Sequence, residues 1–358
     1  MSKKLVVVAG GTGGHIFPGI AVADYLKNQG WEVSWIGTPD RMEAEVVPKH
    51  NIEIDFINVK GVRGNGLKRL IKAPFMVLNA ILQARKVLKS QQPDVVLAMG
   101  GYVTGPTGIA AKSLGIPLVI HEQNAVAGMS NRWLAKFANK VLAAFPSAFD
   151  KGQAELVGNP VRQSVADVPK REVLNPINVL VVGGSLGAQV LNQTLPEAFK
   201  VMANTCDLNV WHQTGKGHLE SVKAAYKLHQ FTEQQVKVAQ FIDDMDAAYS
   251  WADIVICRAG ALTVSEIAAA GKMAVFVPFP HAVDDHQTAN AQYLVMANGA
   301  LLMPQGQFNK QSIVALLSPY LAQPKLIDEM ANNAKKQAIL DATASVAAHC
   351  EQVTNKRK

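Results

Sequence analysis

The amino-acid sequence predicts an α/β protein with parallel β-sheets that carry helices on both faces. Short continuous apolar runs alternate with helical patterns along all 358 residues, which is typical of strands buried on both faces. A strand, glycine-rich turn and helix open the chain, and the same order recurs at residues 177–195. The chain is also too long for one core of ordinary size. We therefore predict two doubly wound, Rossmann-like domains.

The first half contains continuous apolar runs that end in glycine or polar residues. These runs are the predicted strands 4–9, 32–37, 93–101 and 116–124. Helices are expected from about Pro18 to Gln29 and over 107–115. In open sheets of this kind, ligands bind at the carboxyl ends of the strands, so the turns there are the first places to look for function.

The second half repeats this order. INVLVVGGSLGAQVLNQTL (177–195) matches the start of the chain, and ADIVICRAGALTVSEIAAAG (252–271) resembles residues 93–115. The stretch VADVPKREVLNP is charged, contains two prolines and is typical of a linker. We therefore expect four segments: a first domain at 1–164, a linker at 165–176, a second domain at 177–340, and a C-terminal helix and tail at 341–358.

Charge and composition narrow the classes of partner. The formal net charge is +7, which favours anionic partners such as phosphates, nucleic acid or an acidic membrane surface. Cys206, Cys257 and Cys350 fall in no metal-ligand spacing and fit a reducing compartment. The start of the chain is predicted to be a first strand rather than a signal peptide. No apolar run has the length of a membrane-spanning helix, so we expect any membrane contact to be peripheral.

Three glycine-rich turns follow predicted strands and lead into helices: GGTGGH (Gly10–His15), GGYVTG (Gly100–Gly105) and GGSLGA (Gly183–Ala188). Glycine lets a ligand approach the backbone closely. A helix amino terminus presents N–H groups and the positive end of the helix dipole to an anion. A single turn of this form is explained equally well as a tight structural turn. Three of them at corresponding sheet edges favour phosphate binding.

The sequence argues against a nicotinamide cofactor. The GxGxxG pattern fails at Ile16, and no acidic residue ends the second strand of either half, at Trp35–Thr38 or Trp211–Gln213. A Walker phosphate loop is absent as well. HEQNA, which begins at His121, lacks the second histidine of an HExxH metal site. We expect neither a cofactor nor a metal site.

Two acidic motifs each allow a structural and a functional interpretation. Asp244 and Asp246 form a DxD pattern, which binds a metal diphosphate in some sugar transferases, but acidic residues also favour a helix start, and we prefer that explanation. Thr263 and Glu266 fit a T-x-x-E capping box. The same glutamate could instead accept hydrogen bonds from two ribose hydroxyls. The residues alone slightly favour the cap.

Nine stretches in order from Ala9 to Ala291 together point to one family: AGGTGGHIFPGIAVA, RMEAEVVPKH, VLAMGGYVTGP, HEQNAVAG, VGNPVR, VVGGSLGA, FIDDM, RAGALTVSEIAAAG and PFPHAVDDHQTANA. The chain closely resembles the MurG family of peptidoglycan synthesis. These enzymes transfer N-acetylglucosamine (GlcNAc) from UDP-GlcNAc to lipid I, which is undecaprenyl-pyrophosphoryl-N-acetylmuramic acid (MurNAc)-pentapeptide, with inversion. The resemblance implies a GT-B fold, in which two Rossmann-like domains face each other across an interdomain cleft.

The resemblance also implies site residues. It assigns UDP-GlcNAc binding mainly to the second domain, through Ser185, Ile242, Ala261, Leu262, Thr263, Val264, Ser265, Glu266 and Gln287. Arg162 in VGNPVR joins them, and Thr12, Gly13, Gly14 and Asn124 contribute from the first domain. Among these, Arg162 and Ser185 are expected at the diphosphate, Ile242 at the uracil, Glu266 at the ribose hydroxyls and Gln287 at the sugar hydroxyls. A carboxylate has about four acceptor positions, so Glu266 can serve both as cap and as ligand residue.

The first-domain loops are expected to face the acceptor's pyrophosphate through Gly10, Gly11, Gly100, Gly101 and Tyr102. His15 is our candidate for the general base that takes the proton of the MurNAc C4 hydroxyl, since imidazole titrates in the right range. The alternative is that His15 only orients the loop or binds the donor sugar. Arg162 and a helix amino terminus would stabilise the departing UDP without a metal. Some family members have two adjacent glutamines where this chain has His286–Gln287.

The lipid acceptor implies a peripheral protein on the cytoplasmic face of the bacterial inner membrane. Gly66–Lys89 mixes apolar with basic residues, as segments that dock on anionic membranes do. Such a stretch also fits a helix that packs its apolar face on the sheet. Other cell-wall synthesis or division proteins are further expected partners. Nucleic acid is not, because the chain has no aromatic-rich basic platform.

Two alternative functions remain at this point. One is another GT-B enzyme that uses a UDP-sugar, such as a glycolipid synthase or a UDP-GlcNAc 2-epimerase, and acceptor specificity distinguishes it. The other is a noncatalytic nucleotide-binding protein, which would bind UDP without transferring sugar.

Overall fold

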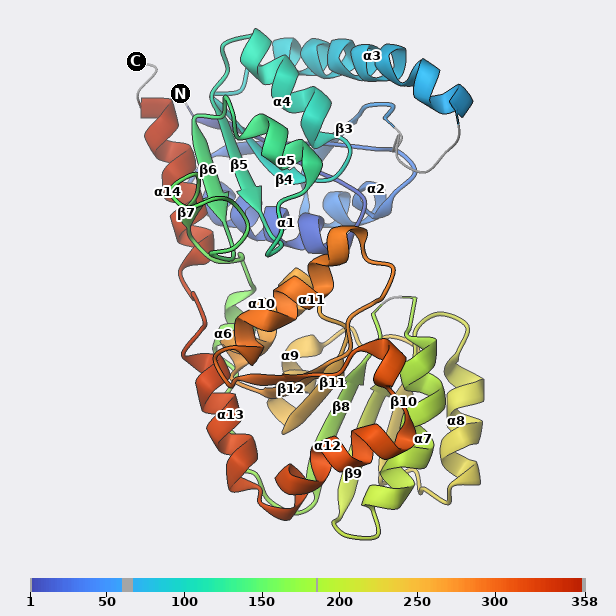
Figure 1. Cartoon of the computed structure of the whole chain (residues 1–358). Helices are drawn as coiled ribbons and strands as arrows, with labels where there is room; N and C mark the ends of the chain where they lie inside the picture. The colour runs from blue at the N-terminus through green and yellow to red at the C-terminus, as the bar shows by residue number, and fades with distance from the viewer. Residues whose placement is uncertain (1, 60–66, 185, 356–358) are drawn as a thin grey trace. The chain divides into compact units, whose positions relative to one another are not determined.

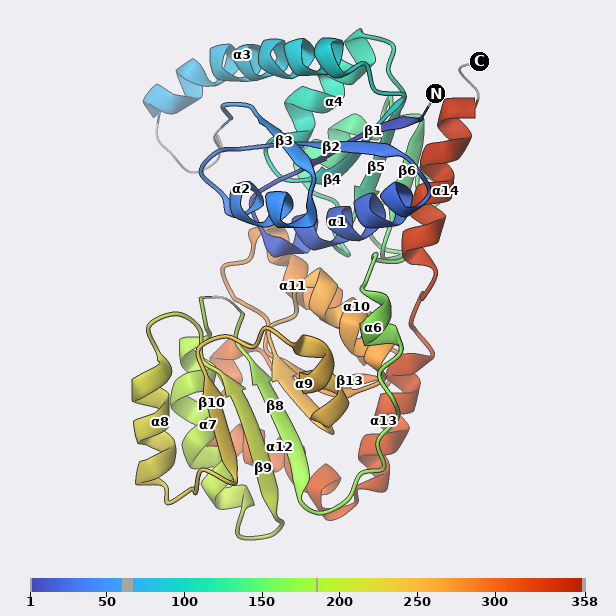
Figure 2. The same cartoon turned by 180° about the vertical axis from the view of Figure 1, so that it is seen from behind.

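The computed structural model describes residues 2–59, 67–184 and 186–355. The chain forms two compact units. Unit 1 comprises Met1–Val161 and Ile339–Lys358, and unit 2 comprises Arg162–Ala338 (Figure 1). Each unit is built on one parallel sheet with helices on both faces, as the sequence predicts (Figures 1 and 2).

The sheet of unit 1 has seven strands in the order β3-β2-β1-β4-β5-β6-β7. Their bounds are β1 Lys4–Ala9, β2 Glu32–Gly37, β3 Glu53–Phe56, β4 Val95–Gly100, β5 Leu118–Glu122, β6 Lys140–Ala143 and β7 Glu155–Leu156. The strand order reverses between β1 and β4, so their carboxyl ends form the topological switch point where ligands bind in such sheets. The pairing of β1 with β4 shifts register between Val8 and Ala9, which is paired with Gly100.

The helices of unit 1 cover two separate apolar clusters. They are α1 Gly13–Asn28, α2 Met42–Val46, the short 3₁₀ helix η1 Val47–His50, α3 Leu67–Gln91, α4 Thr104–Ser113, α5 Met129–Leu134 and α14 Ala342–Asn355. On one face, Ile16 and Leu26 of α1 share a core with Val346 and Cys350 of α14. On the other face, Leu88 of α3 packs with α4 against the sheet.

Unit 2 repeats the design with six parallel strands in the order β10-β9-β8-β11-β12-β13. Its strands are β8 Ile177–Val182, β9 Leu208–Gln213, β10 Val236–Ala239, β11 Ile254–Cys257, β12 Met273–Phe276 and β13 Ala300–Leu302. Its helices are α6 Gln163–Ala166, α7 Gln189–Met202, α8 Leu219–Leu228, α9 Met245–Trp251, α10 Ala261–Ala270, η2 Val283–Asp285, α11 His286–Val295, η3 Gln305–Gln307, α12 Lys310–Ala322 and α13 Lys325–Lys335. The switch point lies between β8 and β11.

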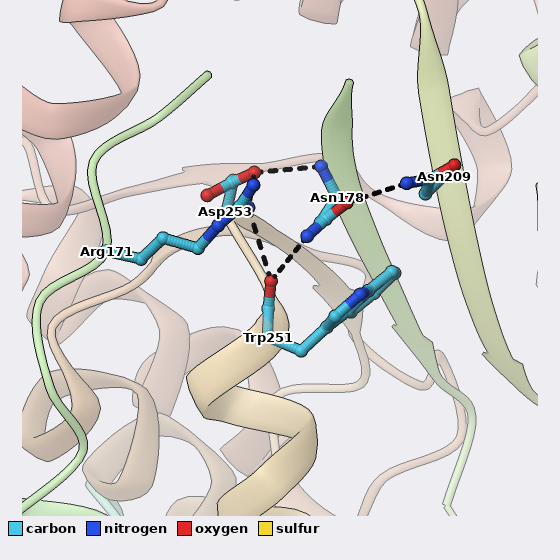
Figure 3. A network of polar contacts seen from close by, with 5 residues as sticks. All are labelled: Arg171, Asn178, Asn209, Trp251 and Asp253. Carbon is cyan, nitrogen blue, oxygen red and sulfur yellow. Dashed lines mark hydrogen bonds and ion pairs between the residues drawn. The ribbon is translucent and has the colours of Figure 1, made fainter. Parts of the chain in front are cut away.

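A polar network anchors the segment before β8 to the amino-terminal edge of this sheet (Figure 3). Arg171 pairs with the buried carboxylate of Asp253, which also accepts a hydrogen bond from the Asn178 amide at 2.8 Å. The Asn178 side chain donates to the Trp251 carbonyl at 2.9 Å and accepts from Asn209. The stretch expected as a linker is therefore tied to unit 2 at Arg171, on the edge opposite the glycine turns.

Helix α1 begins at Gly13, five residues before the predicted start at Pro18. Thr12 is extended, and its carbonyl accepts hydrogen bonds from the amides of His15 and Ile16. The second pair of glycines is thus the first turn of the helix rather than part of a loop. His15 consequently has a fixed place on a helix.

Over residues 2–59, 67–184 and 186–355, no helix is both long and apolar enough to cross a bilayer. Within the same residues, no three histidine, cysteine or acidic side chains are grouped so that they could hold a metal ion.

Candidate functional site

The glycine turn after β1 is held in place by a buried glutamate. Glu43 Oε2 accepts a hydrogen bond from the Gly11 amide at 3.0 Å. Its Oε1 accepts from the amide and the hydroxyl of Thr38 at 3.0 and 2.7 Å. A Cβ on Gly10 would lie 2.6 Å from this oxygen, so the glycine makes room for the carboxylate. Glu43, which the sequence analysis missed, thus joins the ends of β1 and β2.

The turns after β1 and β4 lie against each other at the switch point. The Gly10 amide donates to the Gly100 carbonyl at 3.3 Å. Gly101 has a φ of +89°, and a Cβ there would lie 2.2 Å from the Gly10 carbonyl oxygen. Only glycine allows this approach. Tyr102, the next residue, is exposed. The structure therefore brings together all five residues expected at the acceptor's pyrophosphate.

His15 lies in the first turn of α1 beside the β4 turn. Its Nδ1 is 2.7 Å from Gln123 Oε1. A Cβ on Gly100 would lie 2.6 Å from the same Nδ1, so the β4 turn packs closely on this edge of the ring. His15 is partly exposed, whereas Gln123 is buried. Thr12, Gly13, Gly14 and His15 are consecutive residues at the start of this helix.

Asn124 is positioned by Glu122, a second buried carboxylate. Glu122 Oε1 accepts from the backbone amide and the side chain of Asn124 at 3.0 and 3.1 Å. Its Oε2 accepts from the Gly128 amide and from Asn131 Nδ2 at 3.0 and 2.9 Å. Four donors thus saturate this carboxylate. The glutamate of HEQN is therefore a structural anchor of the loop after β5.

In unit 2, the turn after β8 is tied to the loop after β10 through Gln213. Gln213 Nε2 donates to the Gly184 carbonyl at 3.1 Å, and its Oε1 accepts from the Ile242 amide at 3.0 Å. One buried side chain therefore sets the spacing between the glycine turn and the expected uracil contact. Ser185, the predicted diphosphate contact in this turn, lies outside the described residues.

Helix α10 begins at Ala261, and this start corrects the predicted capping box. The N-cap residue is Gly260, with φ −62° and ψ 143°, and no side chain caps the helix. Thr263 is therefore the third helical residue and cannot be the N-cap. The chain enters the helix directly from the β11 turn, because Gly260 already has the extended backbone that an N-cap requires. The predicted run Ala261–Glu266 forms the first two turns of α10.

Glu266 faces a tyrosine and an arginine. Tyr249 Oη donates to Glu266 Oε2 at 3.1 Å. Arg162 Nη2 lies 4.0 Å from Glu266 Oε1 and 3.3 Å from Asp246 Oδ1. Burial raises the pKa of the Glu266 carboxyl to about 7, although Arg162 and the Tyr249 hydroxyl act in the opposite direction. The side chain is only 13% exposed. Tyr249 gave no signal in the sequence.

The DxD pattern is a helix start, as predicted. Asp244 is the N-cap of α9, and its side chain accepts from the Ala247 amide at 2.9 Å. Asp246 lies in the first turn of that helix and pairs with Arg162. Both carboxylates therefore have structural roles.

Gln287 lies in the first turn of α11, after an unusual backbone turn. Asp284 and Asp285 both have left-handed backbone conformations, with φ of 52° and 48°. Gln287 Oε1 accepts from the Phe279 amide at 2.9 Å. The glutamine side chain thus closes the loop that the two strained residues shape. Left-handed non-glycine residues of this kind are common at ligand sites.

Both halves of the chain match one known family. Residues 5–143 match the glycosyltransferase family 28 N-terminal domain, and residues 178–346 match the family 28 C-terminal domain. The chain is 85% identical, over 100% of both chains, to a protein of Pseudoalteromonas translucida named UDP-N-acetylglucosamine--N-acetylmuramyl-(pentapeptide) pyrophosphoryl-undecaprenol N-acetylglucosamine transferase. It is 54% identical to the Psychromonas ingrahamii protein of the same name, covering 98% of this chain and 99% of that one.

Solved structures agree with the sequence matches. The crystal structure of Acinetobacter baumannii MurG superimposes with a TM-score of 0.85 at 42% identity, and the match covers 98% of this chain and 99% of that one. A co-structure of S. aureus MnaA with UDP shares the fold alone, with a TM-score of 0.69 at 13% identity and coverage of 99% and 97%. The chain therefore belongs to the MurG family within glycosyltransferase family 28 and has its GT-B fold of two Rossmann-like domains.

Proposed function

We propose that the protein transfers GlcNAc from UDP-GlcNAc to the C4 hydroxyl of MurNAc in lipid I, which gives lipid II for peptidoglycan synthesis. The observation that carries this proposal is the 85% identity, over the full chain, to the P. translucida enzyme whose name states this donor and acceptor. Both glycosyltransferase family 28 domains are present in the order that such an enzyme requires.

The donor nucleotide binds to unit 2 at its switch point. The turn at Gly183–Ala188 and the amino terminus of α10 flank the carboxyl ends of β8 and β11. Both present backbone amides suited to a diphosphate. Ile242, which Gln213 holds next to the Gly184 turn, contacts the uracil. This placement supports the nucleotide roles that the family resemblance implies.

Glu266 binds the ribose hydroxyls in its ionised form. A carboxylate accepts hydrogen bonds from two vicinal hydroxyls, and the Tyr249 bond leaves further acceptor positions. Arg162 keeps a positive charge close to this carboxylate and to Asp246. The same guanidinium stabilises negative charge on the departing diphosphate, which lowers the barrier without requiring a metal. Gln287 contacts the sugar hydroxyls.

The transfer step is an inverting displacement. The MurNAc C4 oxygen forms a bond to the anomeric carbon of GlcNAc, while the bond from that carbon to the UDP oxygen breaks. His15 takes the proton of the attacking hydroxyl, and UDP leaves with the bonding electron pair. His15 suits this role because it lies beside the two glycine turns proposed for the acceptor's pyrophosphate. A positioned general base contributes about 10²–10⁴-fold.

Transfer of labelled GlcNAc from UDP-GlcNAc to a lipid I analogue tests both the function and the base. We expect the wild type to form product and His15→Ala to lose about 10²-fold or more in kcat. The variant should retain its affinity for UDP-GlcNAc in a direct binding assay. Full activity of His15→Ala would remove His15 as the base. Absence of transfer by folded wild type would refute the function itself.

We also propose that α3 docks the protein on an anionic membrane surface. Phe75, Leu78 and Leu82 repeat at helical spacing and are all exposed. Lys86 and Lys89 lie on the same helix and are exposed as well. The opposite side of α3 uses Leu88 to pack on the sheet, so the two interpretations of this stretch apply to different faces. Gly66 lies outside the described residues, and described side chains begin at Pro74.

Docking of this kind would place the protein at the cytoplasmic face of the inner membrane, where lipid I is presented. Exposed Ile109 and Lys112 lie on α4, the helix that packs beside α3. They extend the mixed apolar and basic surface across two helices. Other proteins of cell-wall synthesis or division remain proposed partners on the basis of the family resemblance.

A further inference from the structure

A chain of four hydrogen-bonded groups runs from the core of unit 1 to His15. His121 Nε2 lies 2.9 Å from the carbonyl oxygen of Gly158. Gln123 Nε2 lies 2.9 Å from His121 Nδ1 and 3.1 Å from the His121 carbonyl oxygen. Gln123 Oε1 lies 2.7 Å from His15 Nδ1. The chain therefore begins at a backbone carbonyl and ends at the proposed base.

The first link fixes the protonation of His121. A carbonyl oxygen only accepts hydrogen bonds, so His121 Nε2 must carry the proton that it donates to Gly158. The ring is fully buried, and burial lowers its pKa to about 4, so it is neutral near pH 7. In a neutral imidazole only one nitrogen is protonated. His121 Nδ1 is therefore an acceptor.

The second link fixes the orientation of the Gln123 amide. Its NH₂ group faces two acceptors, His121 Nδ1 and the His121 carbonyl oxygen. The reversed orientation would point the Gln123 amide oxygen at both of them. Three buried acceptors would then face one another without a donor, which is unfavourable. Asn159 donates to the Gln123 backbone carbonyl at 3.1 Å and holds this residue from the other side. Gln123 Oε1 must therefore face His15.

The last link fixes His15 itself. An amide oxygen only accepts, so the proton between Gln123 and His15 belongs to His15 Nδ1. Gly100 packs against this edge of the ring, where any Cβ would lie 2.6 Å from Nδ1. Among residues 2–59, 67–184 and 186–355, no side chain or backbone group is hydrogen-bonded to His15 Nε2. In the neutral ring this nitrogen carries an unshared electron pair.

We propose that Gln123 and His121 are positioning residues that hold His15 in the Nδ1–H tautomer, so that Nε2 is the nitrogen that accepts the acceptor's hydroxyl proton. The inference rests on the proposed function for its catalytic consequence, but the tautomer itself does not depend on it. A free neutral imidazole prefers to carry its proton on Nε2. The relay reverses this preference and directs the electron pair away from the core.

Nitrogen-15 NMR of ring-labelled histidine tests the tautomer directly in the wild-type protein. The chain has nine histidines, and the spectrum of His15→Gln identifies the His15 signals. We expect His15 Nδ1 to show the shift of a protonated nitrogen and Nε2 that of an unprotonated one, at a pH where the ring is neutral. The opposite pattern at His15 would overturn the proposal without any variant of the relay.

Two substitutions at Gln123 separate positioning from packing. Gln123→Met keeps the size of the side chain but removes its acceptor, so the His15 signals should move toward the Nε2–H tautomer. Gln123→Glu keeps an acceptor opposite His15 Nδ1, so the Nδ1–H tautomer should remain. We expect Gln123→Met to lower kcat by about tenfold or more, with KM for UDP-GlcNAc within about twofold.

The outcomes distinguish the inference from the proposed function. A wild-type Nδ1–H signal without GlcNAc transfer to lipid I analogues would remove the function and leave the relay. Transfer that is unchanged in a Gln123→Met protein with an altered tautomer would remove the catalytic role of the relay. If Gln123→Met does not fold, the wild-type spectrum and Gln123→Glu still decide the tautomer.

Discussion

Glu266 is a buried residue of the fold for which we also propose a role in ligand binding. The protein buries this carboxyl beside Tyr249 and Arg162, and burial raises its pKa to about 7. A buried carboxyl of this kind is costly to ionise, and enzymes accept such a cost where a ligand needs the charge. The hydroxyls of a bound ribose would donate hydrogen bonds to the Glu266 carboxylate and so replace the hydrogen bonds with water that it loses on burial.

The raised pKa predicts how Glu266→Gln changes stability with pH. Between about pH 4.5 and 7 the folded protein holds a proton on Glu266 that the unfolded chain has released, so wild-type stability falls as the pH rises. Glu266→Gln cannot bind this proton, so its free energy of unfolding does not fall with pH for this reason. Relative to wild type, its free energy of unfolding should therefore increase by about 3 kcal/mol between pH 4.5 and pH 8.

Urea unfolding of both proteins at these two pH values measures the difference. Glu220→Gln on α8 is the control, because its side chain is 84% exposed. A pH-independent difference between Glu266→Gln and wild type would contradict the buried, proton-binding carboxyl.

Gly101 and Gly30 are a matched pair for testing the contact between the two glycine turns. Their φ values are +89° and +85°, but a Cβ at Gly30 meets nothing within 4 Å, whereas one at Gly101 meets the Gly10 carbonyl at 2.2 Å. Gly30→Ala should lower the free energy of unfolding by about 1–2 kcal/mol through backbone strain alone. Gly101→Ala should cost more than about 3 kcal/mol, because the β1 and β4 turns must separate.

Thermal or urea unfolding of the two alanine variants checks this order. Transfer activity should also fall in folded Gly101→Ala and not in Gly30→Ala. If both variants lower the free energy of unfolding by the same amount, the close contact between the β1 and β4 turns does not contribute to stability.

At the level of elements, local motifs misplaced two helix starts. The pattern T-x-x-E suggested a cap at Thr263, yet α10 begins earlier, after Gly260. Likewise α1 begins at Gly13, within a stretch whose glycines suggested a loop. In both cases the helix begins directly after the turn that follows a parallel strand. For α1 this geometry outweighs the low helix propensity of Gly13 and Gly14. Such a start leaves the first amides uncapped by side chains.

The exposed face of α3 yields a prediction on membrane binding. Phe75 is 75% exposed, and Leu78 and Leu82 follow on the same face. Replacing these three residues by serine should weaken binding to vesicles with anionic lipid by about tenfold or more, because each apolar side chain loses roughly 1.5 kcal/mol or more of burial. Vesicle co-sedimentation measures the loss.

Leu228 on α8 provides the matched control, since it is 78% exposed and belongs to unit 2. Leu228→Ser should bind vesicles like wild type. The triple variant should keep its activity on a water-soluble acceptor analogue. Unchanged vesicle binding of the triple variant would refute docking through α3.

At the level of the whole molecule, both parallel sheets could be predicted from the internal repeat. Hydrophobic periodicity and glycine-rich turns can each be recognised in a short stretch of sequence. The same signals located the switch-point turns. The sequence could not show which side chains hold these turns, since Glu43, Gln123 and Gln213 act on segments far from them along the chain. Each is buried and polar, and such residues are recognised only once the fold shows what they contact.

The final helix, which was predicted as part of a C-terminal helix and tail at 341–358, completes the core of unit 1. Val346 and Cys350 pack there with α1, nearly the whole chain length away (Figure 2). An amphipathic pattern shows that a helix has an apolar side, but it does not identify the sheet that this side will cover.

This return of the chain sets an order for folding during translation. Unit 2 is one continuous stretch, Arg162–Ala338, so all of its residues leave the ribosome before α14 does. Unit 1 is discontinuous, and its core lacks Val346 and Cys350 until the codons of α14 have been read. Multidomain chains generally fold from the amino terminus onward. Here unit 1 begins to be synthesised before unit 2, but its core can be completed only after unit 2 has been synthesised.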